Sequence, residues 1–343
     1  MKFAFSDDQR LLAETLAELL AAECSHEALA GAWESESGQL PGLWGQLAEM
    51  GVLGASVPEA QGGLGFDAVD TVLMLEELGR CACPEPVAEL VSVAAPLLAE
   101  VGGEIAEQWL PRIAAGEARV ALGFEAEPYV PGAAQADLLI LQRGDEVHAL
   151  SPEAAKLEPR DSVDGARRLF SVDWSPLPAT RLAGGAEGAA LAARAWNRAA
   201  HAAAAQLLGL GRQLIEMTVE YAKGRVQFGQ PIGAFQAVKH HVANALTKLE
   251  FARPPVYYAA HSLASDLPSS DLDVSTAKAL ASDAAQLCSR VALQCHGAIA
   301  YTYEYHAHMW MKRVLVLRES AGSARWHRRR AAGLLLDREI QTS

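Results

Sequence analysis

The sequence predicts a mainly α-helical protein with a small β domain in its middle. In both terminal parts of the chain, apolar residues recur at spacings of three and four, as on one face of a helix. Between them, residues 118–183 hold short apolar runs broken by Gly, Asp and Pro, which is typical of strands and turns. With 50% hydrophobic and 21% charged residues, the 343-residue chain has the composition of an ordered globular protein. We therefore expect three domains, at residues 1–117, 118–183 and 184–343.

The N-terminal domain is predicted to be helical. In "SDDQRLLAETLAELLAAE", Ser6 stands where an N-cap is expected, acidic residues follow in the first turn, and Leu and Ala then recur with helical spacing. The pattern continues in "LPGLWGQLAEMGVLG" and "DAVDTVLMLEELGR". The Gly-rich stretch "PEAQGGLGF" between them is predicted to be a turn, because Gly adopts positive φ without strain.

The middle and C-terminal domains differ in the period of their apolar residues. Strands are expected in "ARVALGFE", "ADLLILQRGDEVHALSP" and "RRLFSVDW", and the β domain ends near "LPATRLAGG". Ala-rich amphipathic segments follow, which we expect to form a four-helix bundle. They run over residues 184–224, 235 to about 267, about 270–297 and about 304–336.

Charge and composition exclude several classes of partner. The formal net charge of −13 disfavours nucleic acid and anionic membrane surfaces, which attract basic proteins. The sequence contains no run of ~20 uncharged apolar residues, so no membrane span is predicted. The five Cys form no CxxC pair and no signal peptide precedes them, so we expect a reduced, cytoplasmic location. The histidines of "HH" (240–241) and "HAH" (306–308) lack further ligands at suitable spacing, so no metal site is predicted.

The stretch "RVQFGQPIGAFQ", residues 225–236, contains more chemistry than a turn between helices requires. A guanidinium matches phosphate oxygens and an aromatic ring packs on a purine, so Arg225, Phe228 and the glutamines suit a flat, anionic ligand. The simpler interpretation is that Arg225 stabilises a helix C-terminus and that Phe228 belongs to the core.

Five motifs together resemble the acyl-CoA dehydrogenase family over nearly the whole chain. They are "FSDDQRLL", "MGVLGASVPEAQGGLGF", "EELGR", "RVQFGQPIGAFQAVKH" and "QCHGAIAYTYEYHAHMWMKR". The resemblance implies a fold with an N-terminal helical domain, a β domain and a C-terminal four-helix bundle. It also implies FAD, an acyl-CoA substrate, an electron acceptor flavoprotein, and a dimer or a dimer of dimers.

The resemblance assigns FAD contacts to five residues. In such enzymes the Arg-x-x-Phe-Gly segment reaches across a subunit interface to the neighbour's flavin, with Arg near the pyrophosphate and Phe and Gln near the adenine end. A second segment, here "QCHG", faces the same flavin. The residues carried over are Arg225, Phe228, Gln236, Gln294 and Gly297.

The catalytic base of the family has no counterpart at either expected position. The reaction removes an α-proton with a Glu while the β-hydrogen leaves as hydride to the flavin. In many members this Glu lies in a Tyr-Glu-Gly-Thr pattern, where this chain has Ala321 in "RESAGSARW". In others it lies on the helix before the Arg-x-x-Phe-Gly segment, where this chain has Ala199. We therefore expect no catalytic residue here, with Glu319 or Glu304 as a relocated base in the alternative.

The middle domain departs from the family as well. Flavin rests there on a loop of the type Thr-Glu-Pro-x-x-Gly-Ser-Asp, of which Glu127 and Pro128 in "GFEAEPYVPG" are the only remnant. The whole pattern resembles the non-catalytic subunits of heteromeric α2β2 bacterial acyl-CoA dehydrogenases, some of which act on steroid CoA esters. It implies a homologous catalytic partner whose FAD site this chain completes in trans. A self-sufficient homomeric enzyme and a flavin-free structural partner remain as alternatives.

Overall fold

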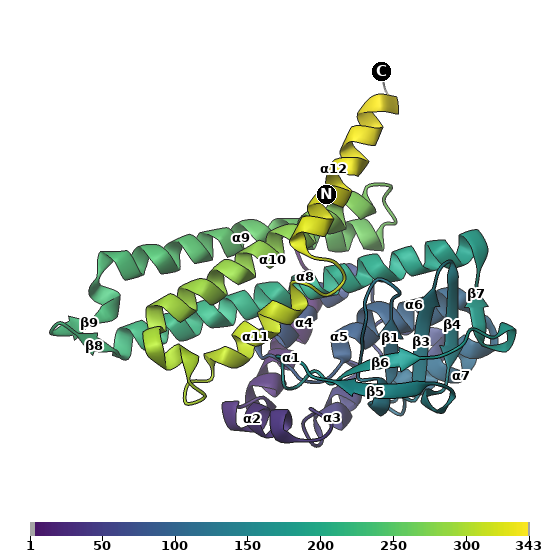
Figure 1. Cartoon of the computed structure of the whole chain (residues 1–343), viewed down its shortest axis with the longest axis horizontal. Helices are drawn as coiled ribbons and strands as arrows, with labels where there is room; N and C mark the ends of the chain where they lie inside the picture. Colours follow the sequence, from purple (N-terminus) through teal and green to yellow (C-terminus); the bar gives the residue numbers. More distant parts are fainter. Residues whose placement is uncertain (1–3, 342–343) are drawn as a thin grey trace. The chain divides into compact units, whose positions relative to one another are not determined.

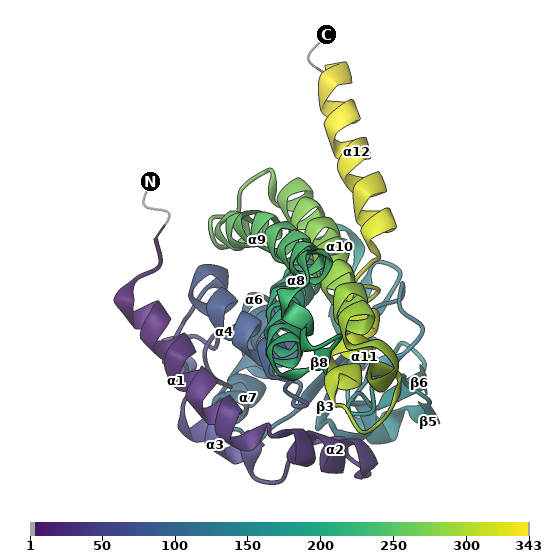
Figure 2. The same cartoon turned by 90° about the vertical axis from the view of Figure 1, so that its left-hand side faces the viewer.

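The computed structural model describes residues 4–341, shown from two directions in Figures 1 and 2. The chain divides into two compact units, each made of separate pieces. The bundle unit comprises Met1–Ala22, Val72–Cys83 and Ala203–Ser343, and the sheet unit comprises Glu23–Thr71 and Pro84–Ala202. The division into domains 1–117, 118–183 and 184–343 stays a prediction. The predicted class, mainly α with a small β domain, is confirmed.

The N-terminal third is helical, as predicted. Its main helices are α1 (Asp7–Glu23), α2 (His26–Glu34), α3 (Leu43–Glu49), α4 (Ala68–Arg80), α6 (Ala95–Val101) and α7 (Gly103–Ala114), with α5 (Val87–Glu89) leading into the single turn η2 (Leu90–Ala94). Ser6 caps α1: its Oγ accepts from the N–H of Gln9 at 3.1 Å, and Gln9 Oε1 accepts from the N–H of Ser6 at 2.8 Å. This reciprocal pair is a capping box, which fixes the start of the helix.

The β domain contains two small sheets. The first sheet has the order β1-β3-β4-β7, with β1 (Val120–Gly123), β3 (Leu138–Arg143), β4 (Glu146–Leu150) and β7 (Arg181–Ala183). The second sheet has the order β2-β6-β5, with β2 (Val130–Pro131), β6 (Leu169–Asp173) and β5 (Lys156–Arg160). Only β1 and β3 pair in parallel, in the register Val120 to Leu138. The predicted strand segments are present as β1, β3, β4 and β6. The strands β2, β5 and β7 were not predicted, because they are short or carry alternating exposed charges.

The C-terminal part forms the expected bundle. It contains α8 (Gly185–Gly224), α9 (Gln236–Ala264), α10 (Ser270–His296), α11 (Ala307–Leu317) and α12 (Ala324–Gln341). Figure 1 shows α9 and α10 running alongside each other. Small buried residues such as Ala245 and Ala252 on α9 and Ala281 on α10 allow close approach of the backbones.

The prediction of one helical segment from 304 to 336 is wrong, because a loop separates α11 from α12. Ala321 and Gly322 have φ of +52° and +96°, which a helix does not admit. The buried Lys278 on α10 holds this loop: its Nζ donates to the carbonyls of Arg318 and Gly322, both at 3.1 Å. Ser323 then starts α12, because its Oγ accepts from the N–H of Trp326 at 3.3 Å.

Candidate functional site

Residues 225–236 form a hairpin between α8 and α9. The strands β8 (Val226–Gln227) and β9 (Gln230–Pro231) pair antiparallel, and Phe228 and Gly229 form the turn with φ of +53° and +79°. Positive φ at both turn residues matches the right-handed twist of a two-residue hairpin. A bulky residue in this region is strained, which is typical of functional sites. The Phe228 ring is 93% exposed, so its interpretation as core is wrong.

The other predicted residues of the hairpin are exposed too. The N–H of Arg225 donates to the carbonyl of Tyr221 at 2.9 Å, and its own carbonyl accepts from the N–H of Ile232 at 2.8 Å, which closes the hairpin. The guanidinium of Arg225 forms no ion pair with any side chain that the structure describes. Gln236 is the exposed first residue of α9. The segment therefore presents a cation, an aromatic ring and an amide outward, at the end of the bundle that Figure 1 labels β8 and β9.

The segment "QCHG" ends α10. Gln294 is exposed on its last turn, and Gly297 follows the helix with φ of +69° and ψ of −142°, a conformation that favours glycine. Open space surrounds the position where a Cβ of Gly297 would lie. The ring of His296 stacks on that of Tyr221, the residue that holds Arg225, with centroids 4.4 Å apart. The structure therefore brings the base of the hairpin and the "QCHG" segment together.

Neither position expected for the catalytic base carries an acid. Ala199 is a half-buried residue of α8 in the sheet unit. Ala321 lies in the loop before α12, in the bundle unit, and is 3% exposed. His327 Nε2–H donates to the carbonyl of Ala321 at 2.8 Å. Burial, reinforced by Lys278 and Arg330, lowers the pKa of His327 to about 4, so this histidine is neutral at pH 7.

The two alternative bases lie in exposed positions. The side chain of Glu319 is 58% exposed and forms an ion pair with Arg318 at 3.2 Å. Glu304 is exposed in the turn before α11. The catalytic base of the family acts in a site shielded from water, and within this chain neither carboxylate has that shielding.

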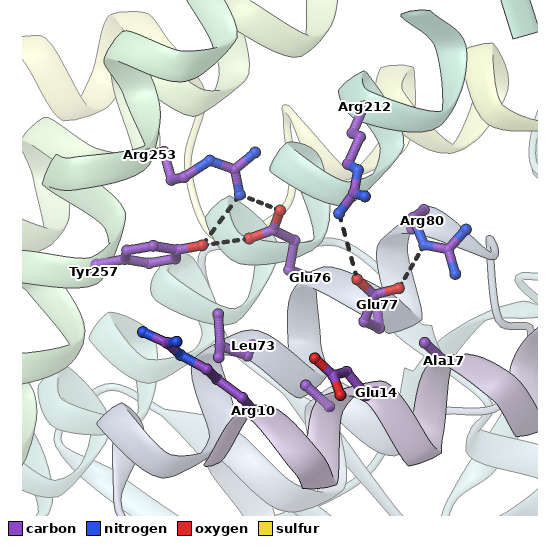
Figure 3. A pocket seen from close by; sticks show the side chains of 11 residues that line it. Arg10, Glu14, Ala17, Leu73, Glu76, Glu77, Arg80, Arg212, Arg253 and Tyr257 are labelled. Carbon is purple, nitrogen blue, oxygen red and sulfur yellow. Dashed lines mark hydrogen bonds and ion pairs between the residues drawn. The ribbon is translucent and has the colours of Figure 1, made fainter. Parts of the chain in front are cut away.

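The "EELGR" motif joins helices of the bundle unit through charged side chains (Figure 3). Glu76 is buried, and its carboxylate accepts from Arg253 Nη1 and from the hydroxyl of Tyr257. Glu77 accepts from Arg80 Nε at 2.5 Å and lies 3.7 Å from Arg212 Nη1. Sequence reasoning gave this motif no role. Its signal is a pair of adjacent acids within an apolar helix, which need cationic partners when buried.

These side chains line an open cavity of about 490 Å³ in the bundle unit. Glu76 and Glu77 use their oxygens on arginines and the tyrosine, and the lining as a whole carries four arginines and three glutamates. The lining residues are Arg10, Ala13, Glu14, Ala17, Leu73, Glu76, Glu77, Arg80, Arg212, Arg253 and Tyr257. The arrangement attaches α4 to α8 and α9 and is structural.

The β-domain loop that holds flavin in the family is a short turn here. Residues 124–129 connect β1 to β2, and the N–H of Glu127 donates to the carbonyl of Phe124 at 2.9 Å. Pro128 is exposed and Glu127 half-buried. The turn offers no Thr, Ser or Gly in the family's spacing, in line with the expected shortened flavin support.

Among residues 4–341, no three His, Cys, Asp or Glu side chains cluster as metal ligands. No helix in the same range has the length and apolarity that crossing a bilayer requires. All five cysteines have free thiols.

Comparison with known proteins defines the family. The model of the acyl-CoA dehydrogenase N-terminal domain matches residues 6–117, and that of the C-terminal domain matches residues 186–336. Acyl-CoA dehydrogenase IpdE2 of Mycolicibacterium smegmatis is 34% identical over 310 residues, which cover 90% of this chain and 92% of that protein. Its namesake in Mycobacterium tuberculosis is 31% identical, covering 90% and 91%. The chain belongs to the acyl-CoA dehydrogenase family.

Solved structures confirm the fold. The ChsE4-ChsE5 complex from Mycobacterium tuberculosis contains a chain with a TM-score of 0.86 and 22% identity, covering 100% of both chains. The Tcur3481-Tcur3483 steroid acyl-CoA dehydrogenase has a TM-score of 0.86 and 23% identity, covering 97% of this chain and 99% of that one. At these identities the likeness concerns the fold.

The family implies FAD, and the residues at the hairpin fit part of it. An unpaired exposed guanidinium suits the pyrophosphate, and an exposed ring suits the adenine. Open backbone at Gly297 leaves room for close approach. The fit concerns exposed groups of this chain.

Proposed function

We propose that this protein is the non-catalytic subunit of a heteromeric acyl-CoA dehydrogenase and completes the FAD site of a homologous catalytic subunit in trans. The assembly is an α2β2 heterotetramer that desaturates the Cα–Cβ bond of an acyl-CoA in the cytoplasm. The isolated chain is inactive. A separate flavoprotein accepts the electrons.

The observation that supports this proposal is the combination of Ala321 with an intact hairpin. The loop around Ala321 keeps a defined backbone, held by Lys278 and His327, but presents a methyl group. Removing an α-proton requires a base within hydrogen-bond reach of that proton, which a methyl group does not supply. The hairpin meanwhile directs Arg225 and Phe228 outward, where they can serve only a ligand outside this chain's own core.

Each predicted contact residue has a distinct role in the proposed complex. FAD supplies the hydride acceptor when bound. The guanidinium of Arg225 pairs with its phosphates, Phe228 packs on the adenine, and the amides of Gln236 and Gln294 donate and accept hydrogen bonds. Gly297 lets the backbone approach closely. The partner subunit contributes the Glu and the flavin-supporting loop.

The substrate class is proposed from the relatives. One similar structure is a steroid acyl-CoA dehydrogenase, and both similar structures are complexes of two different chains. We infer a bulky acyl group such as a steroid side-chain CoA ester. When the roles are split between two chains, only half of the sites catalyse the reaction. This division leaves space for a large ring system.

The first experiment expresses this chain alone and together with a homologous dehydrogenase subunit, and measures bound flavin and assembly mass. Flavin and a tetramer only in the co-expressed sample support the proposal. A yellow homo-oligomer of this chain alone, bleached by an acyl-CoA, contradicts it and favours a homomeric enzyme with Glu319 or Glu304 as base.

A variant separates trans completion from a purely structural subunit. In the complex, Arg225→Ala is expected to weaken FAD binding about 10- to 150-fold, from a charged hydrogen bond of about 1.5–3 kcal/mol. Arg325→Ala is the matched control, because Arg325 is an exposed arginine on α12, away from the hairpin. Unchanged FAD content in the Arg225 variant would indicate the flavin-free structural partner.

A further inference from the structure

Three aromatic rings meet where the two segments proposed to contact FAD join the bundle. His296, the last residue of α10, contacts Tyr221 of α8 and Tyr305, which precedes α11. The His296 and Tyr221 centroids are 4.4 Å apart with the planes at 30°, and the His296 and Tyr305 centroids are 4.5 Å apart at 43°. The two tyrosine rings are 5.8 Å apart. All three lie in the bundle unit.

The imidazole of His296 is fixed by one hydrogen bond and by burial. Its Nδ1–H donates to the carbonyl of Ala292, one turn earlier on α10, at 2.7 Å. The residue is 5% exposed, and its Nε2 is buried without a partner among the described residues. Burial lowers the pKa of His296, and because Nδ1 carries the proton of the neutral ring, Nε2 is an acceptor.

This ring connects the hairpin with the "QCHG" segment. Tyr221 stacks on one face of it, and the carbonyl of Tyr221 accepts from the N–H of Arg225 at 2.9 Å. His296 is also the residue before Gly297 in the chain, and the N–H of Gly297 donates to the carbonyl of Leu293. The imidazole therefore packs on the residue that bonds the first residue of the hairpin and belongs itself to the "QCHG" segment.

We propose that His296 is a positioning residue that holds the hairpin and the "QCHG" segment in register for FAD. The inference rests on the proposed function and assigns a new role to a residue that does not itself touch the ligand. Two exposed segments that must meet one rigid cofactor need a fixed spacing, because a misplacement near 1 Å is costly. The contacts of the imidazole with the two tyrosine rings supply that spacing.

The chemistry of the stack explains a histidine at this position. Phe retains both ring contacts but cannot bond the carbonyl of Ala292. Asn keeps a donor near the place of Nδ1 but loses the ring. The buried Nε2 acceptor is unfavourable for stability, since an unsatisfied buried polar group costs free energy.

The test uses the co-expressed complex and measures FAD affinity and the unfolding midpoint of each variant. His296→Ala is expected to weaken FAD binding about 10-fold, from the loss of two aromatic contacts. His296→Phe restores the affinity to within about 3-fold of the unsubstituted complex, because the ring contacts return. If His296→Ala does not fold, Tyr305→Leu, which removes one of the two ring contacts of His296, is expected to weaken FAD binding about 3-fold.

Leu249→Ala separates positioning from stability. Leu249 is fully buried on α9 of the same bundle, so its truncation lowers the unfolding midpoint but leaves FAD affinity within about 2-fold. The inference is overturned if His296→Ala binds FAD normally, if Leu249→Ala weakens binding equally, or if His296→Phe is as weak as His296→Ala. Normal affinity in His296→Ala together with a loss in Arg225→Ala refutes this inference alone. Normal affinity in Arg225→Ala refutes the proposed function as well.

Discussion

The buried His327 predicts that this protein loses stability in weak acid. Burial lowers the pKa of His327 from its ordinary 6.5 to about 4, so the folded state binds a proton less readily than the unfolded state. A histidine with a lowered pKa contributes stability that is fully present above pH 6.5 and is lost as the pH falls toward 4. Between pH 7.5 and pH 5, these two pKa values correspond to a loss of about 2 kcal/mol in the free energy of unfolding.

Urea unfolding of the chain at both pH values measures this loss. His327→Gln keeps an N–H that can reach the carbonyl of Ala321 but does not titrate, so its stability should fall by about 2 kcal/mol less over the same range. His240→Gln, at an exposed position of α9, is the matched control for the exchange of a histidine for glutamine. An equal fall in the His327 variant and the unsubstituted chain would refute the reasoning.

Three further changes test other parts of the structure. Glu76→Ala leaves Arg253 without its buried partner and should lower the free energy of unfolding, measured in urea titrations, by about 3 kcal/mol. Glu250→Ala removes an exposed partner of the same arginine and should lower this free energy by less than about 1 kcal/mol. Phe228→Gly relieves the positive φ and should raise the midpoint of the chain slightly while weakening FAD binding in the complex; a lower midpoint would show that the turn is not strained. Lys278→Met removes the donor to two loop carbonyls and should cost about 2 kcal/mol, measured by urea unfolding, with no loss contradicting the role of this lysine.

The sequence predicted the elements whose signals are local. Ser6 caps α1 because the Ser-x-x-Gln pattern needs no distant partner. The period of apolar residues likewise placed the helices and the central strands. Residues 225–236 were recognised as an unusual surface from their composition, and the structure exposes Phe228 there.

Features that depend on distant partners were missed. The interruption at Ala321 and Gly322 depends on Lys278, which lies 40 residues or more away in the sequence. Glu76 and Arg253 are separated by 177 residues, so nothing near either one indicates the pairing. The stack around His296 joins residues from three parts of the C-terminal region, and a single histidine in "QCHG" carries no sign of it. Such contacts become visible only when the bundle is assembled.

The discontinuous bundle unit has a consequence for synthesis. Its pieces at Met1–Ala22 and Val72–Cys83 emerge from the ribosome before Ala203–Ser343, the part against which they pack. Until the later helices are made, buried residues of α1 such as Leu16 and Leu20 lack most of the residues of their own unit. The sheet unit, complete by Ala202, can fold first, while the bundle unit closes late. The nascent chain thus offers apolar surface to chaperones, and the hairpin becomes available to a partner only after the whole sheet unit has been made.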